Sequence, residues 1–377
     1  MSATRVRAFV RAEREILFAF VFSRLLVWAV AWMSFHGFRH GKFSSEPTGE
    51  ALWNLLFRWD AGWYGAIVRS GYDYAPGQES RAAFFPLYPL CLRALCWLTG
   101  ASTPLAGFLL SNLFLLGSAI LLHRLVTIDF PQPSRVPART VWLLLLTPVT
   151  FFHSAVYTES LFLFLSLGAF LAARKQNWAI AGVAGALLSA TRANGILIAL
   201  PLFWEAAVEA WRRPDFRWAR TLRACAWLLL VPLGLAGFCV YLYFRFGDAL
   251  AFVHATAAWD RGLTTPWRAI ANTFGYSSFY VRLFLATEAI ALATFVCGFR
   301  VPLRMSYQIY AGVMLLLLVC NTLLESLPRY VSVLFPLQLT LAALTVKSEG
   351  LYFALLGTSA AFLAMCVGLF VGGYWMT

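Results

Sequence analysis

The sequence predicts an all-α polytopic membrane protein. Of its 377 residues, 60% are hydrophobic and only 12% are charged, whereas about a quarter of the residues are charged in a soluble domain. Apolar segments of roughly twenty residues, the length of one bilayer crossing, recur along the chain between short connections rich in arginine. The net charge of +13 therefore reflects membrane topology, and no nucleic-acid partner is expected.

The first apolar segment, residues 16–35, is long enough to remain as an uncleaved signal anchor. Arginines at positions 5, 7, 11 and 14 precede it, which places the N-terminus in the cytoplasm. Further membrane segments are expected at residues 105–125, 140–156, 159–173, 178–191, 195–211, 224–246, 279–298, 305–324, 330–346 and 351–375. About eleven transmembrane helices result.

These segments form a single membrane domain over residues 1–377. We expect a core module at 1–246, followed at 247–377 by an outer loop and the C-terminal transmembrane helices. A long first outer loop, about 37–102, contains the apolar stretch 84–98, which is too short to cross and is interrupted by prolines. It is expected to lie as a helix along the outer membrane surface.

The positive charges support this topology. If residues 84–98 do not cross, every short connection on the inside is basic, including the one that carries Arg212, Arg213, Arg217, Arg220 and Arg223. If residues 84–98 did cross, that five-arginine connection would lie outside. Small residues in 178–191, among them Gly182 and Gly185, indicate close helix packing.

Two hairpins, 140–173 and 178–211, have short legs of about 25 Å against a hydrophobic core near 30 Å. Their tips should stop within the outer face of the membrane. The same side receives the loop 247–278 and the turn 325–329, so most of the outer charged residues converge on one cavity. Arg192, within an apolar stretch at one tip, should pair with a carboxylate or a phosphate.

The first outer loop contains the polar and aromatic stretch RWDAGWYGAIVRSGYDY, residues 58–74. Its tryptophans and tyrosines are typical of a membrane interface. An interfacial helix does not account for the acid between Trp59 and Trp63, however. Asp60 is therefore a candidate general base, placed where desolvation would favour its acceptance of a proton.

A cavity with one base and several arginines suits transfer of a sugar from a lipid-borne phosphate to an acceptor hydroxyl. A single displacement inverts the anomeric configuration and needs only one carboxylate. No cluster of His, Asp and Glu has metal-ligand spacing, so neither a metal nor another cofactor is expected. The seven cysteines are dispersed in apolar runs, which indicates buried thiols rather than disulfides.

Several motifs in order resemble the PIG-V family of mannosyltransferases. They are RWDAGWYGAIVRSGYDY, FFPLYPL, TPVTFFHSAVYTESLFLFLSL, SATRANGIL, FGDALAFVHATAAWDRGLTTPW and LPRYVSVLFPL, and they extend from about residue 15 to about residue 340. The resemblance implies a GT-C membrane fold, a polyprenyl- or dolichyl-phosphate sugar donor and a catalytic Asp in the first outer loop, at the position of Asp60. Eukaryotic members add the second mannose in GPI-anchor assembly.

The remaining site residues are assigned by motif, polarity and position. The donor phosphate is assigned to Arg192 in TRANG, Arg329 in LPRY and Arg261 in WDRG. The sugar or the acceptor is assigned to residues that share the outer side: Trp59, Trp63, Tyr64, His153, Glu159, Asn194 and Asp260. Ala61 and Gly62, directly after the acid, depart from the family pattern.

The identity of the acceptor is left open, and either a glycolipid or a glycan is expected. Lysine occurs only at Lys42, Lys175 and Lys347, a bias common in GC-rich bacteria. The protein is therefore expected in a bacterial inner membrane with its site facing outward.

Three other hypotheses for the function are a flippase or other transporter of lipid-linked sugars, a scaffolding subunit, and an acyltransferase with His153 as base.

Overall fold

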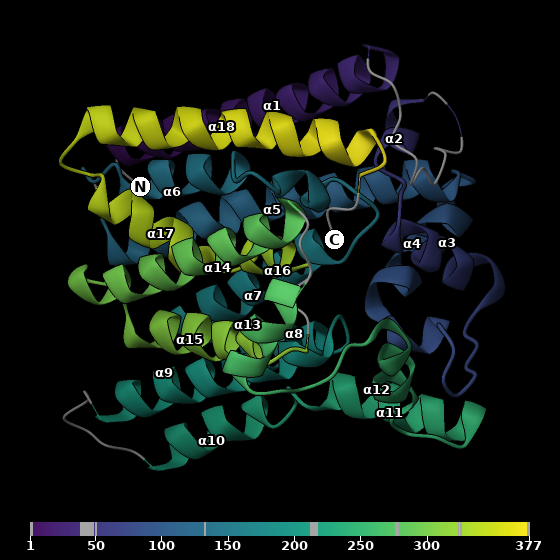
Figure 1. Cartoon of the computed structure of the whole chain (residues 1–377). Coiled ribbons are helices and arrows are strands. Elements are labelled where there is room, and N and C mark those ends of the chain that lie inside the picture. The colour runs from purple at the N-terminus through teal and green to yellow at the C-terminus, as the bar shows by residue number, and fades with distance from the viewer. Residues whose placement is uncertain are drawn as a thin grey trace.

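The computed structural model of the chain is a bundle of helices (Figure 1). It describes residues 3–37, 49, 51–131, 133–211, 218–275, 279–322, 324 and 326–374. Over these residues the chain forms helices and turns, with one isolated β-bridge between Leu263 and Asn321. The predicted all-helical fold class is confirmed. Arg212, Arg213, Arg217 and Glu325 lie outside the described residues.

Long and short α-helices alternate along the chain, with brief 3₁₀ helices between some of them. In chain order, the α-helices are α1 (Ala3–Gly37), α2 (Leu52–Leu55), α3 (Asp60–Ser70), α4 (Leu87–Thr99), α5 (Thr103–Asp129), α6 (Val136–Leu145), α7 (Glu159–Arg174), α8 (Trp178–Ser189), α9 (Ala199–Trp211), α10 (Trp218–Leu228), α11 (Leu233–Phe246), α12 (Ala251–Thr256), α13 (Pro266–Gly275), α14 (Phe279–Cys297), α15 (Met305–Val319), α16 (Leu327–Val331), α17 (Phe335–Leu344) and α18 (Glu349–Val371). The 3₁₀ helices are η1 (Arg81–Ala83), η2 (Thr150–His153), η3 (Ala193–Ile198), η4 (Ala257–Trp259) and η5 (Gly298–Arg300).

Five stretches among the described residues are long and apolar enough to cross a membrane. They are Glu13–Gly37 in α1, α5, Ala193–Trp211, Thr221–Phe246 and α18. The apolar helices α4, α6, α8, α15 and α17 have only 10–17 residues, less than the roughly twenty that a full crossing needs. The polytopic membrane class is confirmed, whereas the predicted number of about eleven transmembrane helices is not.

Two of the predicted continuous helices are interrupted at prolines. Residues 140–156 do not form one helix, because α6 ends at Leu145 and the chain continues through turns and η2. Pro148 lies just after this end, where it lacks an N–H and disfavours helical geometry in the preceding residue. Likewise, residues 224–246 are divided between α10 and α11, with Pro232 at the N-terminal cap of α11.

The small residues of α8 pack closely against this divided segment, as predicted. A Cβ atom added at Gly182 would lie 2.1 Å from the carbonyl oxygen of Trp227, and one at Gly185 would lie 2.6 Å from the side chain of Val231. Both distances are far below van der Waals contact. Only glycine therefore allows α8 to approach α10 at this separation.

A buried arginine of the first helix stabilises the irregular chain that follows α6. The Arg24 side chain is 6% exposed and donates to the carbonyl oxygen of Leu145 at 3.1 Å and that of Thr150 at 3.3 Å. It also donates to Ser154 Oγ at 2.7 Å. Non-helical backbone at membrane depth must find such partners, because lipid offers none.

Substitution of Arg24 by Met should destabilise the protein. Each carbonyl left without its donor costs about 1–3 kcal/mol, and thermal unfolding in detergent should show a clear decrease in Tm. Arg14→Met is the matched control, since Arg14 lies exposed on the same helix and should change little. Equal Tm values for the two variants would contradict this role of Arg24.

The segment predicted to be the first outer loop folds into short helices at one end of the bundle. Figure 1 shows α2, α3 and α4 together at the right end of the long helices, and α12 lies at the same end. The predicted 84–98 helix corresponds to α4, which has 13 residues. The hydroxyls of Tyr88 and Ser111 lie 2.8 Å apart and join α4 to α5.

Ion pairs hold the C-terminal end of α7. Arg174, in the last turn of α7, contacts Asp129 at the end of α5 at 2.8 Å. Asp129 also accepts a hydrogen bond from the Tyr307 hydroxyl at 2.6 Å. In the same region, Arg304 makes two 2.8 Å bonds to Glu205. These contacts join α5, α7, α9 and α15, and so fix the helix whose other end reaches the candidate site.

Candidate active site

A cavity of about 420 Å³ lies between the first outer loop, the segment that follows α8, the loop after α11, and α16. The polar residues that line it are Asp60, Tyr64, Thr191, Arg192, Asn194, Thr256, Arg261, Asn321, Arg329 and Tyr330. Aromatic side chains, including Phe84, Phe252 and Trp259, form much of the remaining wall. Burial raises the pKa of the Tyr64 hydroxyl, so this group stays protonated at neutral pH and can donate a hydrogen bond.

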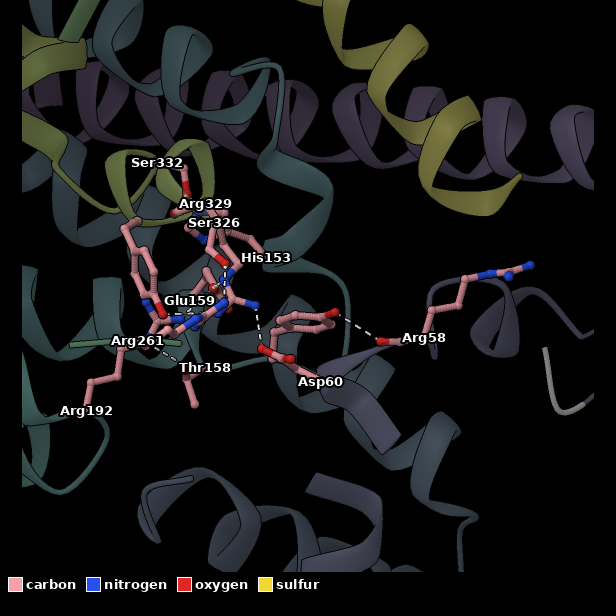
Figure 2. A network of polar contacts seen from close by, with 12 residues as sticks. Arg58, Asp60, His153, Thr158, Glu159, Arg192, Arg261, Ser326, Arg329 and Ser332 are labelled. Carbon is pink, nitrogen blue, oxygen red and sulfur yellow. Dashed lines mark hydrogen bonds and ion pairs between the residues drawn. The ribbon is translucent and has the colours of Figure 1, made fainter. Parts of the chain in front are cut away.

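Four charged side chains lie in a row beside the cavity, with negative and positive groups alternating: Asp60, Arg329, Glu159 and Arg192. We call them the outer charge network. Arg329 Nη1 lies 2.6 Å from Asp60 Oδ2, and Arg329 Nε lies 2.9 Å from Glu159 Oε1. Arg192 Nη2 lies 2.5 Å from the same Glu159 oxygen. Figure 2 shows these side chains converging, and they come from α3, α7, α16 and the N-terminal cap of η3. Residues 269 positions apart in the chain therefore share one ion pair.

Glu159 is the buried centre of this network. Its side chain is 0% exposed and lies in the first turn of α7, where the helix dipole favours a negative charge. A buried carboxylate nevertheless needs cationic partners, and two arginines provide them. Glu159 does not line the cavity. It therefore holds the two arginines in place and does not itself contact a molecule in the cavity.

Arg192 pairs with a carboxylate, one of the two kinds of partner, carboxylate or phosphate, that the sequence predicts. Besides the ion pair to Glu159, its Nε donates to Thr158 Oγ1 at 2.6 Å, and its guanidinium lies 4.8 Å from the centre of the Tyr330 ring. Nη1 of Arg192 has no hydrogen-bond partner among the described residues. Because this atom is itself buried, it is not presented to a ligand in the cavity as the side chains stand.

Arg261 differs from the two arginines of the network. Its Nη2 donates to the hydroxyl of Ser326 at 3.0 Å, and no carboxylate lies within ion-pair distance of it among the described residues. Among the described residues, its positive charge is therefore not neutralised by a carboxylate. Within this part of the chain, Arg261 is the arginine of the cavity wall that an anion can contact without breaking an ion pair.

The backbone before Asp60 has an unusual conformation. Trp59 caps α3 with φ of 55° and ψ of −119°, a region that costs about 1–3 kcal/mol for a residue other than glycine. The preceding residue, Arg58, accepts a hydrogen bond at its carbonyl oxygen from the Tyr157 hydroxyl at 3.0 Å. Figure 2 shows the guanidinium of Arg58 pointing away from the network. The chain turns at this point so that Asp60 begins α3 facing Arg329.

The structure brings some sequence-predicted residues together in the cavity and not others. Asp60, Tyr64, Arg192, Asn194, Arg261 and Arg329 line the cavity, whereas Trp59, Trp63, His153, Glu159 and Asp260 do not. Trp63 instead packs on the wall residues Phe84 and Trp259, with 5.7 Å between ring centres in each case. Asp260 adopts a left-handed conformation with φ of 53° beside Arg261.

His153 lies behind the cavity rather than in it. Its side chain is 0% exposed, and its Nε2 lies 3.1 Å from Ser332 Oγ, which donates to the backbone oxygen of Arg329 at 2.6 Å. This geometry supports the backbone of α16. It gives no support to the alternative in which His153 acts as an exposed base of an acyltransferase.

Four further residues support the site although no role was predicted for them: Tyr157, Thr158, Ser326 and Tyr330. Each contacts an arginine of the cavity or the backbone before Asp60. Thr158 and Tyr157 directly precede Glu159, and Tyr330 directly follows Arg329. For these three residues, a position next to an assigned residue within the YTES and LPRY motifs is the available signal, whereas Ser326 lies outside both motifs.

Comparisons with known proteins agree with this architecture. Among curated proteins, the chain is 34% identical over 167 residues to GPI alpha-1,6-mannosyltransferase 2 of Rattus norvegicus, covering 41% of this chain and 32% of that protein. It is 32% identical over 225 residues to the same-named protein of Cricetulus griseus, covering 54% of this chain and 43% of that protein. The matched region thus spans less than half the length of these relatives.

A solved structure of the oligosaccharyltransferase of Archaeoglobus fulgidus in its apo form superposes with a TM-score of 0.51 over 97% of this chain and 56% of that chain. At 13% sequence identity, this similarity shows a shared GT-C fold and nothing about substrates. The sequence model described as Mannosyltransferase (PIG-V) matches residues 40–279, well over half of the chain and including Asp60, Glu159, Arg192 and Arg261. The chain therefore belongs to the PIG-V mannosyltransferase family.

Proposed function

We propose that the protein is an inverting glycosyltransferase that moves mannose from a polyprenyl- or dolichyl-phosphate donor to an outer lipid or glycan acceptor. The observation that carries this proposal is a cavity in which Asp60 and three arginines face the same space. Membership of a mannosyltransferase family supports mannose as the sugar. A carboxylate beside cationic groups is the arrangement that a displacement at a sugar phosphate requires.

In this reaction the acceptor hydroxyl oxygen attacks the anomeric carbon of mannose. The new bond joins these two atoms, and the bond from the anomeric carbon to the phosphate oxygen breaks. The polyprenyl phosphate leaves with the electron pair, and the hydroxyl proton passes to Asp60. One displacement inverts the anomeric configuration.

The arginines would neutralise the phosphate as it leaves. Arg261, which has no carboxylate partner among the described residues, would contact it first. Arg329 would then exchange its 2.6 Å ion pair with Asp60 for one with the phosphate. This exchange removes the cation from beside the Asp60 carboxylate, which is then free to accept the hydroxyl proton.

Substitution of Arg261 by Gln should raise KM for the donor by about 10–100-fold, because a hydrogen bond to a charged group contributes about 1.5–3 kcal/mol. We expect kcat to change less. Arg268→Gln is the matched control, since Arg268 is exposed on the nearby α13 and does not line the cavity. Initial rates at varied donor concentration measure the effect. Equal KM values for both variants would argue against Arg261 as a phosphate ligand.

The proposed location is a bacterial inner membrane, with the N-terminus in the cytoplasm and the cavity on the outer side. The basic connections predict this orientation. The short outer helices α2, α3 and α4 at one end of the bundle are consistent with an interfacial position beside the cavity (Figure 1). The donor tail would reach the cavity through the membrane.

The proposal is tested with purified protein in nanodiscs. Radiolabelled polyprenyl-phosphate mannose and a lipid extract of the host are supplied, and chromatography detects a new labelled product. Formation of a glycosidic product supports the proposal. The transporter alternative predicts instead that label crosses a sealed vesicle bilayer while the donor stays chemically unchanged. That result would refute the proposed transfer of mannose.

A further inference from the structure

Tyr157 contacts Arg329 and the backbone just before Asp60, which are the two sides of the ion pair between Asp60 and Arg329. Its hydroxyl donates to the carbonyl oxygen of Arg58, two residues before Asp60, at 3.0 Å. The guanidinium of Arg329 lies 5.2 Å from the centre of the Tyr157 ring. The side chain is 1% exposed and does not line the cavity, so it cannot contact a substrate held there. Any effect on the reaction must act through other residues.

The hydrogen bond from Tyr157 adds to the backbone hydrogen bonds of Arg58 and Trp59 that hold a strained turn. Between Arg58 and Asp60, Trp59 has a positive φ of 55°, which residues with a side chain rarely adopt. Such a conformation persists only where its surroundings fix it. A return of Trp59 to negative φ would reorient the start of α3, and Asp60 is the first residue of that helix.

We propose that Tyr157 is a positioning residue, whose hydroxyl fixes the Arg58–Trp59 turn so that the Asp60 carboxylate faces the reacting hydroxyl. This inference rests on the proposed function, in which Asp60 is the base. The ring of Tyr157 serves a separate purpose, because it packs against Arg329 and the neighbouring Phe152. Removal of the hydroxyl alone therefore separates the orientation of the base from the packing of the arginine.

Tyr157→Phe keeps the ring and removes the hydrogen bond. The expected result is a decrease in kcat of about 10–100-fold, since a misplacement of about 1 Å at a reacting group has effects of this size. KM for the donor should stay within about twofold of its original value, because the arginines that bind phosphate are retained. Binding of polyprenyl phosphate, measured without any reaction, should likewise be unchanged.

Tyr310→Phe is the matched control. Tyr310 is likewise buried, at 0% exposed, its hydroxyl lies 3.2 Å from Ser166 Oγ, and it does not line the cavity. This variant loses a buried hydroxyl contact without touching Asp60 or Arg329, and it should keep its kcat. Thermal unfolding of both variants shows whether the loss of a buried hydrogen bond affects them equally.

The outcomes separate this inference from the proposed function. An active unmodified protein with a lowered kcat only in Tyr157→Phe supports the positioning role. Unchanged kcat in Tyr157→Phe, or equal decreases in both variants, would overturn it while the proposed function stands. If the unmodified protein transfers no mannose although it binds polyprenyl phosphate, the proposed function fails, and the positioning role fails with it.

Discussion

Asp60→Asn should reduce mannosyl transfer by about 10²–10⁴-fold, the range that a general base contributes. The amide has nearly the same size and cannot accept the hydroxyl proton. The variant should still bind polyprenyl phosphate, at least as tightly as the unmodified protein, because Arg329 no longer has an ion pair to give up. Transfer rates and binding isotherms on the same preparations measure both effects.

Asp73→Asn is the matched control for this substitution. Asp73 belongs to the same outer loop, but its side chain is 53% exposed and it pairs with Arg81, away from the cavity wall. It should retain near-full activity. Full activity of Asp60→Asn would exclude Asp60 as the base. Weaker phosphate binding in Asp60→Asn would contradict the proposed exchange of Arg329 between Asp60 and the donor.

Glu159→Gln should have the largest effect on stability. Removal of one partner of a buried ion pair costs about 3–5 kcal/mol, because the remaining charge is stranded, and Glu159 is the common partner of two arginines. The double variant Glu159→Gln, Arg192→Gln should recover part of this loss, since it removes one stranded cation. Thermal or denaturant unfolding in detergent provides the comparison.

Glu13→Gln is a suitable control, because Glu13 pairs with Arg124 in a more exposed setting, with 25% and 47% of the two side chains accessible. Exposed pairs contribute about 0–1 kcal/mol, so this variant should unfold near the original temperature. A Glu159→Gln protein as stable as Glu13→Gln would show that Glu159 does not bind the arginines in the folded protein. A double variant less stable than Glu159→Gln would point to a different role for Arg192.

The membrane class and the convergence of distant residues on one cavity could be predicted from the sequence. The membrane class follows from hydropathy, because long apolar segments with few charges are compatible with few structures other than a membrane bundle. The convergence on one cavity follows from the short legs of the two hairpins, which require the tips with Glu159 and Arg192 to end near the same face. The structure places these two side chains 2.5 Å apart.

The helix breaks and the internal supports were not predicted. Pro148 and Pro232 occur inside apolar runs that hydropathy alone predicts to be continuous, although each proline interrupts the backbone hydrogen bonds. The role of Arg24 was not predicted either, because one arginine hardly changes the hydropathy of α1. Its acceptors Leu145 and Thr150 are more than a hundred residues away in the chain. Such contacts depend on tertiary structure and leave no local pattern.

The pairing of Asp60 with Arg329 was also beyond the sequence. Both residues were candidates for the site, but for separate roles as base and phosphate ligand. The predicted topology places the turn 325–329 on the same side as the loop with Asp60, but nothing in the order of residues indicates that Arg329 contacts Asp60 directly. The 2.6 Å ion pair turns two separate assignments into one linked mechanism, in which donor binding and activation of the base depend on each other.

The most direct test of the central claim is the anomeric configuration of the product. Purified protein is supplied with polyprenyl-phosphate mannose of known configuration and an acceptor lipid, and the new glycosidic bond is examined by NMR spectroscopy. A single displacement with Asp60 as base predicts a configuration opposite to that of the donor. A retained configuration, or a product formed only from a nucleotide-activated mannose, would contradict the account.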